Sequence, residues 1–164
     1  MRWRAVAAIV AVLLGVAGCG TSGITGDRLN SAVAPTFADL YVLQQSLRGR
    51  KVTAASTRSK AVCTKGGPST ADRGAGNDWV CAVTWFDTGP DIAQTASYQL
   101  HVQTNGCYTA DGDGPADLNG QQTIVAADGA TVTNPLWEFD GHHLTDGAPF
   151  SGLTGLLREY PQVP

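Results

Sequence analysis

The sequence predicts an α+β domain in which one N-terminal amphipathic helix packs on a twisted antiparallel β-meander stapled by a disulfide. Three observations support this fold class. Apolar residues recur at helical spacing between residues 33 and 47, whereas from residue 57 onward they alternate with polar residues in short β-rich runs. Two turn signals, Asn105-Gly106 and Asp128-Gly129, are typical of hairpins. Because such short loops join neighbouring strands, the strands are expected to be antiparallel.

The first 18 residues have the organisation of an export signal. Two arginines precede an apolar run over residues 5–17 that is too short to span a bilayer comfortably. The sequence Val16-Ala17-Gly18-Cys19 resembles the lipobox of bacterial lipoproteins, in which the cysteine is diacylated and becomes the first residue. This resemblance implies a signal peptide over 1–18, lipidation of Cys19 and a position on the extracytoplasmic face of the cell membrane. An ordinary signal peptide and an uncleaved anchor are the alternatives.

Cleavage after residue 18 would leave 146 of the 164 residues, which is enough for one domain and too few for two. Residues 19–29 predict a lipidated cysteine and a flexible tether, and residues 30–164 a single domain. Removal of Arg2 and Arg4 leaves nine basic and fourteen acidic residues, a net charge of -5 that argues against nucleic acid as a partner. The basic stretch over 48–65 contains no acid. We interpret it as protection of a sheet edge, with anionic lipid headgroups as the alternative partner.

The first element of the domain is the helix. Its apolar stripe recurs at three- and four-residue steps and consists of Val33, Phe37, Leu40, Tyr41, Gln44 and Leu47. Pro35 fits the first helical turn, so Ser31 or Ala34 is the expected N-cap, and Gly49 suits the end of the helix. The apolar face is expected to cover the sheet, and docking on a partner protein is the alternative.

The strands follow. Runs over 57–63, 79–86 and 98–104 have β-rich composition, and Tyr98, Leu100 and Val102 form the expected inward set of the third. Trp79 and Trp85 share one face of the second run, which predicts packing against the helix. Asn105-Gly106 predicts a type I′ turn and a return strand over 107–110, and Asp128-Gly129 predicts pairing of 124–127 with 130–133. A short terminal helix over 151–160 is weakened by two glycines.

Three cysteines remain if Cys19 is lipidated, and exported thiols tend to oxidise. A Cys63–Cys81 bridge would close a loop of about 18 residues and stabilise the fold by about 3 kcal/mol. Pairing of Cys107 with either partner is the alternative. If the favoured pair forms, Cys107 is a buried free thiol or an intermolecular link. A catalytic thiol would need a histidine within reach.

The order of helix, Cys63 strand, Trp79-Val80-Cys81 strand and Tyr98 strand resembles small secreted actinobacterial lipoproteins with a cystatin-like arrangement, in which a sheet wraps a helix. The resemblance covers roughly residues 30–110. It implies a fold and a location rather than an activity, because the biochemical role of such proteins is mostly unknown. The segments Asn105-Gly-Cys-Tyr-Thr-Ala and Asn134-Pro-Leu-Trp-Glu-Phe-Asp-Gly resemble those of chains that have a further cysteine just after the last glycine. His142 occupies that position here, which would leave Cys107 without that partner.

An acidic loop, with Asp111, Asp113 and Asp117, looks at first like a calcium site. It does not fit the EF-hand pattern, because Ala116 stands where glycine is required and Gln122 where a bidentate glutamate is required. We interpret the loop as a solvated Asp/Gly turn, with an irregular Ca²⁺ site as the alternative.

The densest group of metal-ligand residue types is Asp140, His142, His143 and Asp146. Adjacent histidines in an extended segment point to opposite faces, and zinc requires three or four ligands. We therefore interpret the group as an exposed polar turn, with a ligand or metal site as the alternative, and we predict no cofactor. Nearby Trp137 could line a ligand cleft, although packing is the preferred interpretation.

No known catalytic motif occurs in the chain. There is no nucleophile elbow, zinc-protease helix motif or phosphate loop, and Glu138 and Glu159 do not suggest a glycosidase pair. The sequence favours a lipid-anchored binding or interaction module of the cell envelope without catalytic activity, whose partner is an envelope protein or a small ligand. The alternatives are an envelope hydrolase that uses His142, His143 and Asp140, and a carrier of a small ligand or lipid.

Overall fold

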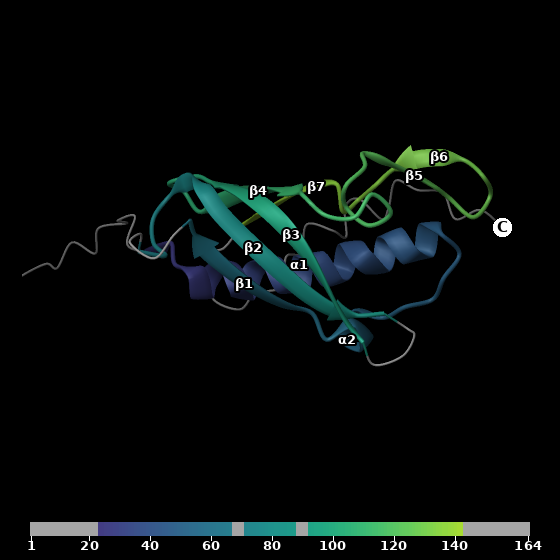
Figure 1. Ribbon diagram of the computed structural model, residues 1–164, viewed down its shortest axis with the longest axis horizontal. Coiled ribbons are helices and arrows are strands. Elements are labelled where there is room, and N and C mark those ends of the chain that lie inside the picture. Colours follow the sequence, from purple (N-terminus) through teal and green to yellow (C-terminus); the bar gives the residue numbers. More distant parts are fainter. Residues whose placement is uncertain (1–22, 67–70, 88–91, 143–164) are drawn as a thin grey trace, which may run out of the picture.

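The computed structural model describes residues 23–66, 71–87 and 92–142. Its main sheet has five antiparallel strands in the order β1-β2-β3-β4-β7, and a separate two-stranded sheet contains β5 and β6. Helix α1 lies along one face of the main sheet, and the small sheet lies beside the C-terminal end of α1 (Figure 1). The elements are α1 (Gly26–Leu47), α2 (Ala54–Thr57), β1 (Lys60–Lys65), β2 (Gly76–Phe86), β3 (Ala93–Val102), β4 (Cys107–Gly112), β5 (Thr123–Val125), β6 (Thr131–Thr133) and β7 (Glu138–His142).

The predicted fold class is confirmed at the level of one main helix on an antiparallel sheet with one disulfide. Meander order holds only for β1 to β4. The chain then leaves the sheet, forms the small hairpin β5–β6 and returns as β7 beside β4. Among the described residues, no helix combines the length and apolarity required to span a membrane.

The start of α1 differs from the prediction. The N-cap is Thr25, whose side chain accepts a hydrogen bond from Arg28 N at 3.3 Å, so the expected caps Ser31 and Ala34 are wrong and Pro35 lies inside the helix. Proline in a helix interior removes one backbone hydrogen bond and costs about 3 kcal/mol. Burial of Ile24 and Leu29 offsets this cost, so the predicted domain boundary at residue 30 falls too late. The end is as predicted, because Gly49 has a positive φ of 74°.

Backbone contacts with the loop before β2 hold the start of α1 in place. Gly26 N donates to Asp72 O at 3.1 Å, and Gly74 N donates to Ile24 O at 3.0 Å. These partners lie far along the sequence, so a local pattern does not reveal them. The five residues before position 28 that the structure describes are therefore part of the fold rather than of the predicted tether.

Aromatic side chains fill the space between α1 and the sheet. Phe37 is fully buried, with ring centroids 5.1 Å from Trp85 and 6.1 Å from Tyr98. Tyr98 in turn lies 5.1 Å from Phe139. The predicted inward faces are confirmed, since Trp79 and Trp85 of β2 and the Tyr98, Leu100 and Val102 set of β3 are all buried. Thr57 belongs to α2 rather than to a strand, because the Thr53–Ser56 capping box starts a short helix there.

Both predicted hairpins form, but with a different turn. Gly106 N donates to Gln103 O and Gly129 N donates to Ala126 O, and only the glycine of each pair has positive φ. These features match a three-residue loop with a glycine bulge rather than the two-residue type I′ turn. The preceding side chains stabilise it, because Asn105 Oδ1 accepts from Cys107 N and Asp128 Oδ1 accepts from Ala130 N.

The disulfide joins Cys63 and Cys81, which are directly opposite each other in the β1–β2 register, while Cys107 is a half-buried free thiol. The favoured pairing is thus present, and the pairing with Cys107 is absent from the structure. The bridge is a cross-strand link within one sheet face, where both cysteines are buried beside the helix.

A buried amide network attaches the segment between β4 and β7 to α1. Gln44 Nε2 donates to Leu118 O at 2.7 Å and to Asn134 Oδ1 at 2.8 Å. Asn134 Nδ2 donates to Leu118 O and Gln121 O, and Asn134 Oδ1 also accepts from Leu136 N. Buried polar groups of this kind are stable only when they are hydrogen-bonded, so this network fixes the position of the loop that contains Leu118.

Candidate functional site

The structure brings some of the predicted metal-type residues to one strand. Asp140 and His142 are two residues apart on β7, and Asp140 Oδ1 accepts a hydrogen bond from Thr109 Oγ1 at 2.7 Å. The predicted exposed turn is therefore wrong for these two positions, which belong to an edge strand. Gly141 allows this pairing because the Tyr108 ring lies across it, and a Cβ added there would meet the ring at 2.3 Å. His143 and Asp146 lie outside the described residues.

Cys107 and His142 form a directly opposed pair in the β4–β7 register. A histidine is thus placed across from the free thiol, as a catalytic cysteine would require. Both residues are half-buried on the β4–β7 strand pair, and they line neither of the two hollows described below. Within the described ranges, no group of three or more His, Cys, Asp or Glu side chains is arranged to hold a metal ion.

The acidic loop and Trp137 have structural contacts. Asp113 N donates to Ser97 O at 3.1 Å, and Asp117 O accepts a hydrogen bond from the Arg48 guanidinium. Trp137 is half-buried in the turn before β7, where its carbonyl accepts from Gly112 N at 2.8 Å. The Trp137 side chain does not line either described hollow.

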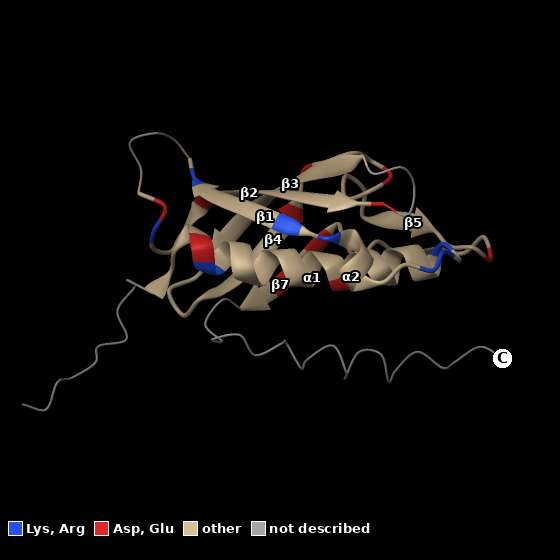
Figure 2. Ribbon diagram, turned by 90° about the horizontal axis from the view of Figure 1, so that it is seen from below, with Lys and Arg blue, Asp and Glu red and all other residues tan. Residues whose placement is uncertain are grey.

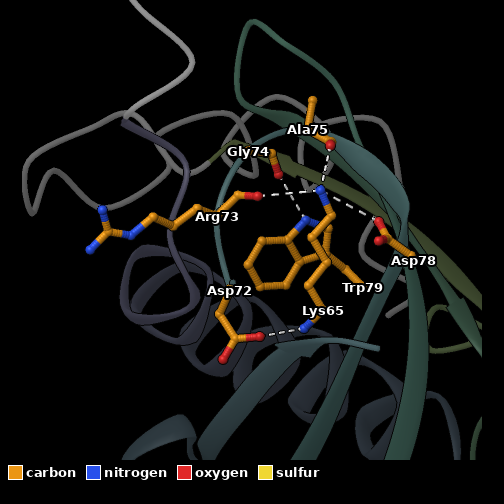
Figure 3. Close-up of polar contacts among 7 residues, drawn as sticks. All are labelled: Lys65, Asp72, Arg73, Gly74, Ala75, Asp78 and Trp79. Carbon is orange, nitrogen blue, oxygen red and sulfur yellow. Dashed lines mark hydrogen bonds and ion pairs between the residues drawn. The ribbon is translucent and has the colours of Figure 1, made fainter. Parts of the chain in front are cut away.

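The basic residues do not gather in one patch, because Lys and Arg are spread along the length of the described molecule (Figure 2). Lys60 and Lys65 lie on β1, the edge strand of the main sheet, where lysine discourages pairing with another sheet. The Lys65 ammonium donates to Ala75 O at 2.7 Å and to Arg73 O at 3.3 Å, and lies 3.6 Å from Asp78 (Figure 3). We therefore assign Lys65 a structural role.

Figure 3 also shows two further hydrogen bonds among the residues around Lys65. Lys65 N donates to Asp72 Oδ1 at 2.6 Å, and Trp79 Nε1 donates to Gly74 O at 3.0 Å. The loop that these bonds fix is the same loop that holds Ile24 and Gly26. We call the end of the domain where α1 begins the proximal end, because it is where the chain enters the fold.

A polar cleft of about 160 Å³ lies at the other end of α1. We call it the distal cleft. It is formed by the last turns of α1, the end of β2, the start of β3 and the loop over residues 115–118. Its polar and aromatic lining includes Tyr41, Gln45, Arg48, Arg50, Trp85 and Asp87.

Two arginines at the rim of the distal cleft have partners within the protein. Arg50 lies 3.8 Å from Asp87, with both side chains partly exposed, and Arg48 donates to the Asp117 carbonyl. Burial raises the pKa of Tyr41, and the Asp87 carboxylate adds to this rise while the Trp85 indole opposes it. Tyr41 is therefore a neutral hydroxyl at physiological pH, and the two arginines balance the formal charges of Asp87 and Asp117.

Two residues of the lining each have a buried polar atom without a hydrogen-bond partner among the described residues. These atoms are Gln45 Oε1 and Trp85 Nε1, in side chains that are only 1% and 5% exposed. The Trp85 indole lies close enough to affect the Tyr41 pKa but makes no hydrogen bond of acceptable geometry. An unpaired buried polar group costs about 1 to 3 kcal/mol, so such groups are rare in folded proteins. Because two of them belong to residues of the same cleft, we regard this cleft as the best candidate for a binding site.

A second hollow, of about 320 Å³, lies between α1 and α2 and is lined largely by alanines, Pro35 and Asp39. It contains no unpaired buried polar atom. The distal cleft was not predicted from the sequence. Its one local signal is the pair Gln44-Gln45 beside an aromatic stripe, where polar amides next to buried rings suggest a buried hydrogen-bond network.

No family model, curated protein or solved structure matches the chain. The function is therefore inferred from the geometry of the site and from the motifs of the sequence.

Proposed function

We propose that the protein is a lipid-anchored binding module on the extracytoplasmic face of the cell membrane, without catalytic activity, and that the distal cleft is its binding site. The observation that carries the proposal is the presence in this cleft of two buried polar groups that the protein itself leaves unpaired. A ligand that pairs them recovers part of their desolvation cost on binding.

The geometry of the domain supports an orientation in which the proximal end lies near the membrane and the distal cleft lies away from it. Residue 23, the first described residue, lies at the proximal end, four positions after Cys19. Four residues span at most about 14 Å, so a lipid on Cys19 would keep the proximal end near the membrane. From Gly26 to Gln45 the helix rises by about 28 Å. The distal cleft would then face away from the lipid and be accessible to envelope components.

The Cys63–Cys81 disulfide supports an exported location, because such bridges persist in oxidising compartments. The lipobox resemblance of Val16-Ala17-Gly18-Cys19 supports the anchor. Together with the cystatin-like helix-and-sheet resemblance, these features favour a small actinobacterial lipoprotein of the envelope.

The other two function classes have less support. A hydrolase based on Asp140 and His142 would need them in a cleft, whereas Asp140 bonds to Thr109 on an exposed strand face. A lipid carrier would need an apolar cavity between helix and sheet. Phe37, Trp85 and Tyr98 fill that space instead.

The anchor is tested by expressing the full-length Cys19→Ser variant in a bacterium with lipoprotein processing and by fractionating the cells. We expect the wild type in the membrane fraction and the variant in the medium or as an unprocessed precursor. Cys107→Ser is the matched control, because it removes a thiol from the folded domain and leaves Cys19 intact; it should behave as the wild type. Membrane association of the Cys19→Ser variant equal to that of the wild type would refute the anchor.

A further inference from the structure

Two buried side chains of the distal cleft lining, Gln45 and Trp85, indicate the chemistry of its ligand. Gln45 Nε2 donates to Gln44 Oε1 at 3.1 Å. Gln44 already uses its own Nε2 as the donor to Leu118 O and Asn134 Oδ1, so its Oε1 is the atom that faces Gln45. The Gln45 amide must therefore present its nitrogen to Gln44, because the opposite orientation would bring two acceptors together. Its Oε1 remains as an unpaired acceptor.

Trp85 supplies the complementary group. Its Nε1–H is a donor only, its side chain is 5% exposed, and it contributes to the same cleft from the end of β2. These two lining residues thus provide one neutral acceptor and one neutral donor without partners. A hydroxyl group can donate to the first and accept from the second. A carboxylate or phosphate could accept from Trp85 but would repel Gln45 Oε1, and an ammonium group has no acceptor to offer Trp85.

The charges at the rim agree with a neutral ligand. Arg50 lies 3.8 Å from Asp87, and the Arg48 guanidinium is bonded to the Asp117 carbonyl, so both cations have partners within the protein. The formal charges of the two arginines and two aspartates cancel. The cleft therefore attracts neither anions nor cations strongly, although its rim groups can accept and donate hydrogen bonds to further hydroxyls.

The volume of the distal cleft limits the size of its ligand. A cavity of about 150 Å³ accommodates a six-membered carbon ring, and the distal cleft measures about 160 Å³. Resting on the function proposed above, we propose that the distal cleft binds a neutral polyhydroxylated ring, the chemistry of a monosaccharide or of one sugar unit of an envelope glycan, with a ring hydroxyl between Gln45 Oε1 and Trp85 Nε1.

The test uses the indole resonances of the ¹⁵N-labelled full chain, purified in a polyoxyethylene alkyl ether detergent, which contains neither sugar nor a charged headgroup. D-glucose, D-galactose, D-mannose and L-arabinose are titrated separately to millimolar concentration. We expect at least one of them to shift the Trp85 indole N–H in a saturable manner. The Trp79 indole is the internal control, because it donates to Gly74 O at the proximal end and should not move.

Two variants connect the shift to the proposed contacts. Gln45→Met removes the acceptor at nearly constant side-chain length, and Trp85→Phe removes the donor; each is expected to weaken binding at least tenfold, with binding to Trp85→Phe followed on the Gln45 amide. Gln99→Met is the matched control, because Gln99 is exposed on β3 away from the cleft lining, and it should bind as the wild type. An unchanged Trp79 indole position verifies that each variant is folded.

The results of these titrations distinguish failure of the sugar proposal from failure of the lipid anchor. No Trp85 shift with any of the four sugars, or equal affinity in Gln45→Met, overturns the sugar proposal. Titrations with inorganic phosphate and glycine betaine are run in parallel, and a saturable shift with either of them alone would show that a charged ligand is preferred and would also overturn it. If the protein binds a sugar but the Cys19→Ser variant associates with the membrane as the wild type does, the proposed binding site stands and only the anchor is refuted.

Discussion

Replacement of the buried Asn134 by alanine is expected to destabilise the fold strongly. Its side chain makes four hydrogen bonds, to Gln44, Leu118, Gln121 and Leu136, and it is 1% exposed. In Asn134→Ala, Gln44 Nε2 and Leu118 O keep each other as partners. Gln121 O and Leu136 N lose the Asn134 contact.

The magnitude follows from these contacts. Leaving a buried group without its hydrogen-bond partner costs about 1 to 3 kcal/mol, and Asn134→Ala does this to two groups, Gln121 O and Leu136 N. We therefore expect Asn134→Ala to lower the free energy of unfolding by about 4 kcal/mol. The assay is urea denaturation of the oxidised protein, with the change taken from the transition midpoint at constant slope.

Asn105→Ala is the matched control. Asn105 is exposed in the β3–β4 turn and accepts one hydrogen bond, from Cys107 N at 3.0 Å, so its removal should cost about 1 kcal/mol or less. If Asn134→Ala and Asn105→Ala lower the stability equally, the amide network does not hold the loop over 113–119, and the argument that positions the distal cleft fails.

Two further predictions concern titration and thiols. Burial raises the pKa of Tyr108 to about 12, against the weaker opposing effect of Thr36, and its hydroxyl has no hydrogen-bond partner among the described residues. Because the folded pKa exceeds the unfolded value of about 10, this contribution to stability is complete below pH 10 and is lost as the pH rises to 12, by roughly 2 kcal/mol. Tyr108→Phe should therefore be nearly as stable as the wild type at pH 7 and should lose less stability between pH 10 and 12; parallel pH profiles of the unfolding free energy would contradict this. Alkylation of the unreduced, denatured mature chain should label Cys107 alone, and peptide mapping that finds the label on Cys63 or Cys81 would overturn the pairing.

Much of the core could be predicted from periodicity. Phe37 and Tyr41 recur on one helix face, and Tyr98, Leu100 and Val102 alternate along a strand, because the two elements place side chains with periods of 3.6 and 2. The disulfide was also accessible, since Cys63 and Cys81 lie on successive strand runs. These features depend on local spacing, which a single sequence contains.

The remaining features depend on contacts between distant residues. The helix extends past Pro35 toward Thr25 because Asp72 and Gly74 bond to its start. Strand β7 forms through Gly141 because Tyr108 covers that glycine. Neither partner is adjacent in sequence, so the preference of proline for the first helical turn gave the wrong start for the helix.

The distal cleft was inaccessible for the same reason. Gln45 lies outside the predicted apolar stripe, and Trp85 reads as an ordinary core residue. Only the fold brings the ends of α1 and β2 together with the loop over 115–118 and shows that two of the buried polar atoms there have no partner. The sequence pattern instead drew attention to Asp140 and His142, whose residue types suit metals but whose strand positions form no such group.

The claim that the domain is held at the membrane through Cys19 is tested most directly by the mass of its N-terminal tryptic peptide. Arg28 is the first cleavage site after Cys19, so the protein extracted from membranes should yield a peptide over residues 19–28 that carries a diacylglyceryl group on the cysteine. An unmodified peptide over 19–28, or a peptide over 5–28 that shows the signal segment was retained, would contradict the account.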